Sequence, residues 1–177
     1  MSLYSFSESL QSIGFLTDIR ESALVYPVIL STHLIGIALF GGMILMTDLR
    51  LLGLGMRDKT ITEVVEGLRI PKRIGLLLIV TCGLLLFGSE ALKYYPNPYF
   101  WTKMTLLVLA AVHYLVFRGS IYNNTEELDK SPVIPSRVKA AAVLSMVLWV
   151  SIPVCGRLIA YYEPDKSKAG QTAEAGR

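Results

Sequence analysis

Two histidines are the residues of this sequence whose type and position could do chemistry. His33 and His113 are the only histidines among the 177 residues, and each lies inside a long apolar run. Imidazole is a good ligand for iron, zinc and copper, and an ionisable side chain within an apolar span is by default a candidate for function. If the two rings face each other, they could bind one haem b as its two axial ligands.

Four apolar runs carry these histidines and most of the chain. A helix needs about 20 mostly apolar residues to cross a bilayer, and a helix leaves no backbone group unpaired in lipid. The composition agrees, with 53% hydrophobic and 18% charged residues. We therefore predict an all-α fold, a four-helix transmembrane bundle. The predicted spans are residues 23–49, 74–92, 100–117 and 140–161.

The segments outside the spans complete a division into three parts. In residues 1–22, Leu3, Phe6, Leu10 and Ile13 recur at helical spacing, which predicts a short N-terminal helix in the membrane interface. A plain solvated helix is the alternative. Residues 163–177 are polar and without periodicity, which predicts a disordered tail. Residues 23–162 form the transmembrane domain.

The basic residues predict an orientation. Lysine and arginine gather on the cytoplasmic side of membrane proteins. Ten lie in the segments between spans one and two and between spans three and four, against six on the side of the termini. We expect a multi-pass membrane protein with both termini outside the cytoplasm. The net charge of +3 and the lack of a basic patch argue against nucleic acid as a partner.

Topology brings the histidines to similar depth. Spans one and three run in the same direction, and His33 lies ten residues into the first while His113 lies thirteen into the third. At 1.5 Å of rise per residue the offset is roughly 5 Å. This predicts that His33 and His113 ligate one haem iron near the middle of the bilayer.

The surroundings of the histidines fit that prediction. Gly36 and Ala110 each lie one turn from a histidine and would leave room for a flat macrocycle. Lys103 and Arg157, at the outer ends of spans three and four, would lie near the propionates, although Arg157 could instead pair with Glu90. The predicted cofactor-binding residues are thus His33, His113, Gly36, Ala110, Lys103 and Arg157.

A second set of charges lies at the other end of the first span. "TDLRLLG" places Asp48 and Arg50 there. Asp48 could pair with Arg73 or Arg118 and pin the helix ends without doing chemistry.

Three stretches carry a resemblance: "HLIGIALFGGMILMTDLRLLG", "NPYFWTKMTLLVLAAVHYLVFR" and "GRLIAYY". In these the chain resembles an uncharacterised bacterial family of small four-helix membrane proteins, a domain of unknown function, over residues 19–162. The resemblance implies an integral inner-membrane protein and no established activity. The bundle with paired histidines is also similar in architecture to b-type membrane cytochromes.

Three functions remain open. The first is a one-haem electron carrier between a quinol or membrane dehydrogenase and an outer acceptor. The second is a cofactor-free structural or accessory subunit that packs beside a larger membrane complex and whose histidines form hydrogen bonds in the core; the chain could also form an oligomer. The third is a small permease lined by Arg157, Glu90 and His33. The sequence has no soluble-enzyme motif, so we assign no reaction.

Overall fold

The computed structural model describes residues 3–162, and within them the chain forms helices and no strand. Four segments are long and apolar enough to cross a membrane, which confirms the predicted all-α fold with four spans. The segments are Val25–Leu52, Ile61–Ser89, Pro98–Tyr122 and Ser136–Ile159. The predicted tail, residues 163–177, lies outside the described residues.

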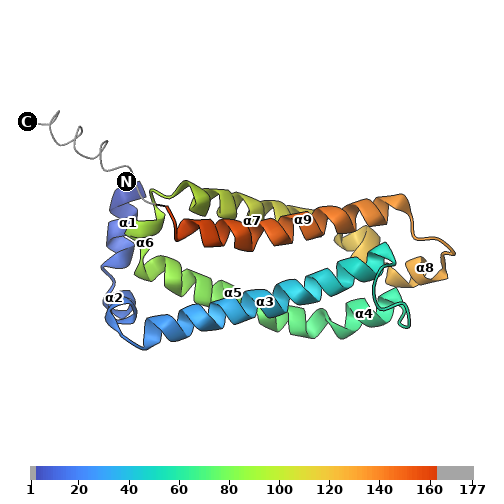
Figure 1. Ribbon diagram of the computed structural model, residues 1–177, viewed down its shortest axis with the longest axis horizontal. Helices are drawn as coiled ribbons and strands as arrows, with labels where there is room; N and C mark the ends of the chain where they lie inside the picture. The colour runs from blue at the N-terminus through green and yellow to red at the C-terminus, as the bar shows by residue number, and fades with distance from the viewer. Residues whose placement is uncertain (1–2, 163–177) are drawn as a thin grey trace, which may run out of the picture.

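The long helices are parallel or antiparallel rods, and short helices cover both ends (Figure 1). The rods are α3 (Val25–Leu52), α5 (Arg69–Ser89), α7 (Pro98–Phe117) and α9 (Ser136–Ile159). One end, called the α1 end below, carries α1 (Leu3–Gln11), α2 (Gly14–Glu21) and α6 (Ala91–Tyr94). The opposite end, the α8 end, carries α4 (Ile61–Gly67), the π-helix η1 (Arg118–Tyr122) and α8 (Thr125–Lys130). The predicted N-terminal helix is therefore present as α1, and α2 follows it.

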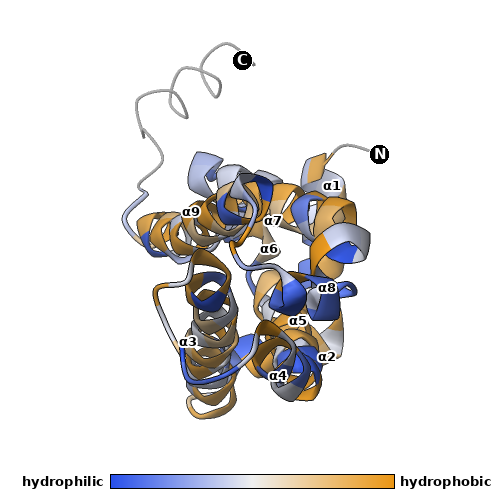
Figure 2. Cartoon of the chain, turned by 90° about the vertical axis from the view of Figure 1, so that its right-hand side faces the viewer, coloured by the Kyte–Doolittle hydropathy of each residue, from blue (hydrophilic) through white to orange (hydrophobic). Residues whose placement is uncertain are grey.

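The rods pack in the order α5, α3, α9, α7. Figure 2 views the bundle end-on and shows the apolar colouring spread around the rods rather than confined to one inward stripe. Leu39, Leu77 and Val108 are examples of large apolar side chains more than half exposed. Such outward apolar surface fits a lipid bilayer. Backbone contacts between α5 and α7 are few, and there the ring of Phe87 stacks on that of Phe100 at 5.2 Å.

Asn97 fixes the start of α7. Its side-chain oxygen accepts hydrogen bonds from the N–H groups of Tyr99 and Phe100, and Pro98 occupies the first helical turn. Its amide group donates to the carbonyl oxygen of Ile159 at 3.0 Å. The beginning of α7 and the end of α9 are thus joined at the α1 end, which sets the relative height of these two helices.

The α8 end contains the main apolar core, packed between α3, α4, η1, α8 and α9. Helix α3 ends at Gly53, whose φ of +75° suits glycine. Helix α4 begins with a capping box formed by Thr60 and Glu63. Asp129 of α8 accepts two further hydrogen bonds from the start of α4, from the N–H groups of Ile61 (2.7 Å) and Thr62 (3.0 Å). These caps fasten α8 to α4.

Candidate functional site

His113 has its hydrogen bond within the bundle. Its Nε2–H donates to the carbonyl oxygen of Ala141 on α9 at 3.0 Å, and its ring centroid lies 4.9 Å from that of Phe117. The side chain is 8% exposed. This is the hydrogen bond that the accessory-subunit hypothesis expects of a core histidine. His113 ties α7 to α9.

His33 lies against α5 instead. A Cβ atom added at Gly83 would lie 3.1 Å from its Cε1 atom, so the absence of a side chain at Gly83 makes room for the ring. The backbone of Ile79, one turn earlier, interacts with the imidazole. The Nδ1 atom is buried, and no group in residues 3–162 forms a hydrogen bond with it. The Nδ1 atom of His33 is therefore free to bind a ligand, whereas the Nε2 atom of His113 is already bonded to Ala141.

The structure does not bring the two histidines together. The rings of Phe40 on α3 and Trp149 on α9 touch at 5.0 Å and give a common level for the two helices. His33 precedes Phe40 by seven residues, about 10 Å toward the α1 end. Ala141, the partner of His113, precedes Trp149 by eight residues, about 12 Å toward the α8 end. The predicted matched depth is wrong, and a bis-histidine haem has no support from this geometry.

The error came from the helix boundaries and from the stagger between helices. Helix α3 begins at Val25, two residues later than predicted, and α7 begins at Pro98, two residues earlier. His33 follows Val25 by eight residues, whereas His113 follows Pro98 by fifteen. Apolar runs report which residues are buried in lipid, but they do not report how far one helix is shifted along another.

Gly36 and Ala110 serve close helix packing. A Cβ atom at Gly36 would lie 2.7 Å from Cγ2 of Ile79, so α3 and α5 approach each other at this point. Ala110 is 8% exposed and packs with Leu148 and Ile152 of α9. Both positions are filled by the facing helix, and neither leaves the room predicted for a macrocycle.

Lys103 reaches into the bundle toward α9. Its Nζ atom lies 3.8 Å from the Cβ position of Gly156, and two of its methylene carbons lie 3.9 Å from it. The side chain is half-buried and acts electrostatically on His33. Within the described chain no carboxylate comes within 4.0 Å of this ammonium group. Lys103 is therefore a cation near His33 without an internal counter-ion.

Arg157 is turned away from this site. It donates to the hydroxyl oxygen of Tyr161 at 2.7 Å and lies 4.8 Å from the centre of that ring. The alternative pair with Glu90 is wrong too, because Glu90 accepts hydrogen bonds from Lys93 (2.9 Å) and from the hydroxyl of Tyr26 (3.1 Å). The bond to Glu90 also raises the pKa of Lys93. Glu90 is thus bonded to Lys93 and Tyr26 rather than to Arg157.

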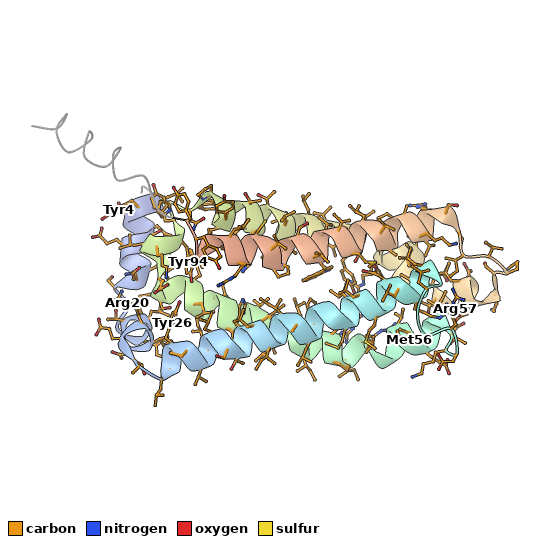
Figure 3. All side chains as sticks on the ribbon, in the orientation of Figure 1. Tyr4, Arg20, Tyr26, Met56, Arg57 and Tyr94 are labelled. Atoms are coloured by element: carbon orange, nitrogen blue, oxygen red, sulfur yellow. The ribbon has the colours of Figure 1, made fainter. Side chains whose placement is uncertain are left out.

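An aromatic cluster borders the site at the α1 end. It consists of Phe87 on α5, Tyr94 on α6 and Phe100 on α7, with ring centroids 5.2 to 6.4 Å apart. The planes of Phe87 and Phe100 are inclined by 8°. Phe87 lies one turn after Gly83, and Phe100 one turn before Lys103. Tyr94, labelled in Figure 3 with Tyr26, closes the end; its burial raises its pKa, so its phenol stays neutral.

The His33 site, defined as His33, Gly83, Lys103 and Gly156, is chemically one-sided. The ammonium group supplies donors, and the imidazole supplies a nitrogen that either donates or accepts. The imidazole of His33 lies against Gly83, and the side chain of Lys103 lies against Gly156. Such a site suits an oxygen acceptor, either a carbonyl or an anion. A metal is less suited, because among residues 3–162 no three His, Cys, Asp or Glu side chains gather where they could hold an ion.

Sequence reasoning found His33 and Lys103 but missed Gly83, Gly156 and the aromatic cluster. Glycines occur throughout these spans, and nothing local distinguishes those that face a nitrogen on another helix. One signal was available: Phe87 and Gly83 lie one turn apart, as do Phe100 and Lys103, so each pair occupies a single helix face.

These features define a class, a four-span helical membrane protein with a nitrogen-lined site inside the bundle. Residues 11–162 match the family of unknown function DUF6644, and the chain belongs to this family. No curated protein and no solved structure matches the chain.

Proposed function

We propose that this protein binds the head group of a membrane quinone at the His33 site. The observation that carries the proposal is the pair of nitrogens without an acceptor, the buried Nδ1 of His33 and the ammonium of Lys103. A buried polar group without a partner costs about 1–3 kcal/mol. A quinone offers carbonyl oxygens that remove this cost, and its quinol offers hydroxyl groups that bond to the same atoms.

The aromatic cluster supports a planar ligand. Flat rings favour offset or edge contact with other rings at centroid separations of 4.5–7 Å. The side of the site toward Phe87 and Phe100 offers such rings one turn from Gly83 and Lys103. A carboxylate ligand would satisfy Lys103 equally well but would make no use of these rings.

The packing of the bundle supports access from lipid. Helices α5 and α7 make few backbone contacts, whereas the neighbouring pairs pack along their length. We expect the head group to enter between α5 and α7 while its isoprenoid tail stays in the bilayer. The proposal thus retains a quinone as partner, as expected from the sequence, but does not involve a haem.

The decisive experiment is calorimetric titration of a short-tailed benzoquinone into the protein in lipid nanodiscs, with empty nanodiscs as the blank. We expect saturable binding that is weakened about 10- to 100-fold by Lys103→Met, because a hydrogen bond to a charged group contributes about 1.5–3 kcal/mol. Gly83→Ala should weaken binding several-fold by displacing the imidazole. Lys93→Met, which removes an exposed lysine at the same end, is the control.

Three outcomes separate the alternatives. Equal affinity of the parent protein, Lys103→Met and Lys93→Met would remove the site from quinone binding. Saturable binding of a fatty acid but not of the quinone would assign the site to a carboxylate. A Soret absorption band that is lost in His33→Leu would show that His33 ligates haem without His113.

We also propose the orientation predicted from the basic residues, with the α8 end in the cytoplasm of a bacterial cell. Fusion of alkaline phosphatase, which folds only outside the cytoplasm, to the C-terminus should give an active enzyme. Fusion of a fluorescent protein in the segment between α8 and α9 should give fluorescence. The reverse pattern would place the His33 site in the inner half of the membrane.

A further inference from the structure

A second group of polar side chains lies inside the bundle near the α8 end. We call it the Asp48 cluster, and four elements contribute to it. Its members are Thr47 and Asp48 of α3, Lys72 of α5, Tyr122 of η1 and Ser145 of α9. The quinone proposal does not use any of these residues.

Asp48 is the most enclosed acid in the described structure. The residue is 1% exposed, and neither carboxyl oxygen has a hydrogen-bond partner among residues 3–162. Ser145 and Lys72 are the polar groups that act on it. An ionised carboxylate in such a position has no hydrogen-bond donor among residues 3–162 to stabilise it.

Lys72 is close but is held by another residue. Its ammonium group donates to the hydroxyl oxygen of Thr47, and that hydroxyl donates in turn to the carbonyl oxygen of Met43 at 3.0 Å. No ion pair within 4.0 Å joins Lys72 to Asp48 in the described chain. The positive charge of Lys72 therefore favours an ionised Asp48 electrostatically, but Lys72 forms no hydrogen bond with either carboxyl oxygen.

The walls of the cluster are apolar. Toward the α8 end, Leu51 lies one turn after Asp48 and is fully buried, together with Ile121 and Ala142. Toward the α1 end, the contact between Phe40 and Trp149 closes the bundle two turns away. Within residues 3–162, no further hydrogen-bond donor reaches the carboxyl group of Asp48 from the α1 end or from the α8 end.

The facing elements bring one other titratable group besides Lys72. Tyr122 acts on Asp48 and on Ser145 from η1, α9 adds the neutral hydroxyl of Ser145, and α4 presents the buried apolar Ile61 and Val65. A π-helical turn is uncommon and is frequent at functional sites. Here η1 is the turn that carries Tyr122 to the cluster.

We infer that Asp48 is a proton-binding site, at which a carboxylic acid forms and dissociates inside the membrane with the hydroxyl of Ser145 as its hydrogen-bond acceptor. On loading, a proton from the aqueous phase at the α8 end bonds to one carboxyl oxygen, and on release it returns to that phase. In both states the hydroxyl of Thr47 remains the hydrogen-bond partner of Lys72. The group changes from a balanced pair of charges to a single positive charge when it is loaded.

Infrared spectroscopy of the purified full-length protein in nanodiscs tests this inference. A protonated carboxyl group gives a carbonyl band separate from the amide bands, and the band shifts in D2O. We expect such a band in the parent protein, with an intensity that changes between about pH 5 and about pH 9, where buried carboxyl groups titrate. Asp48→Asn should abolish the band, whereas Asp58→Asn, an exposed acid at the same end, should leave it.

Two results would overturn the inference. The absence of a D2O-sensitive carboxyl band from the parent protein at every pH in the series would mean that Asp48 stays ionised. A band that persists in folded Asp48→Asn would belong to another acid. Because the first result needs no variant, a failure of Asp48→Asn to fold leaves the test intact. Neither result depends on whether a quinone binds.

Discussion

The His33 site and the Asp48 cluster both bury polar atoms between the same helices, but they leave opposite kinds of atoms unpaired. Among residues 3–162, the buried Nδ1 of His33 lacks a hydrogen-bond partner and Lys103 lacks a counter-ion near the α1 end, whereas the carboxyl group of Asp48 lacks a donor near the α8 end. Under our two proposals, an oxygen-bearing ligand from outside the chain meets the first deficit and a single proton meets the second. The contact between Phe40 and Trp149 lies between them.

This difference teaches that burial alone does not identify a functional residue in a membrane bundle. His113 is more deeply buried than His33, yet its hydrogen bond to Ala141 gives it a structural role. The atoms that bonding within the chain leaves unsatisfied are the better guide.

The largest effect is expected from giving the His33 site its own acid. Lys103→Glu replaces the unpaired ammonium by a carboxylate, which can bond to His33 and repels a ligand oxygen. Loss of a hydrogen bond from a charged donor costs up to about 3 kcal/mol, and the carboxylate also repels the partial negative charge of the quinone oxygen. Quinone affinity should therefore fall by about a thousandfold, or about 4 kcal/mol. Titration in nanodiscs measures the effect, and Lys93→Glu at the same end is the matched control. Retained affinity in Lys103→Glu would place the ligand elsewhere.

The second prediction concerns the aromatic contact between Phe40 and Trp149, which forms a layer between the two sites. Phe40 is 6% exposed and contacts both Trp149 and the position of Gly75. Phe40→Ala should lower the free energy of unfolding by about 3 kcal/mol through lost packing and a cavity. Unfolding in mixed micelles, followed by circular dichroism, measures this change. Leu39→Ala, at an adjacent lipid-facing position, should change stability far less, and equal losses would contradict the role of Phe40 in the layer.

The third prediction separates the two histidines by their effects. His113→Leu removes the hydrogen bond to Ala141 and leaves that carbonyl without this partner. We expect a loss of about 1.5 kcal/mol in the free energy of unfolding and unchanged quinone affinity. His33→Leu should do the reverse, since His33 loses no bond from Nδ1 but loses a ligand contact. A drop in affinity with His113→Leu at unchanged stability would falsify this assignment.

The fold could be predicted from the sequence because hydropathy and length alone specify membrane spans. The four predicted runs each lie within or close to an observed helix, and Leu3, Phe6 and Leu10 of the predicted N-terminal helix lie in α1. The predicted start of the second span, residue 74, was five residues too late, because α5 begins at Arg69. Its first turn contains Arg69, Lys72 and Arg73, and charges end an apolar run without ending a helix.

The sites could be predicted only in part, because they depend on helix stagger and facing. His33 and Lys103 were identified as ionisable residues within apolar runs, but their predicted partners were wrong. Asp48 was expected to pair with Arg73 or Arg118, and its polar neighbours are Lys72 and Ser145. Stagger follows from contacts such as that of Asn97 with Ile159, whose two ends lie more than sixty residues apart in the sequence.

The smallest effect is expected at Asp129, an exposed acid near the α8 end that differs from the buried Asp48. Asp129 loses some hydration in the fold, but the hydrogen bonds from Thr62 and Ile61 and the charge of Arg50 outweigh this and lower its pKa below its ordinary value of 3.8. A lowered pKa in the folded state means that the stabilisation is complete above that ordinary value and is lost as the pH falls through the folded value.

Asp129→Asn should therefore lower the free energy of unfolding by about 0.5 kcal/mol at neutral pH, the low end for a lost cap at an exposed position. The difference from the parent protein should vanish in acid below the lowered pKa of folded Asp129, where this residue is protonated in both states. Unfolding curves at both pH values measure this, with Asp58→Asn as the control. A difference that instead grew on acidification would mean that the fold favours the protonated form of Asp129, against the lowered pKa.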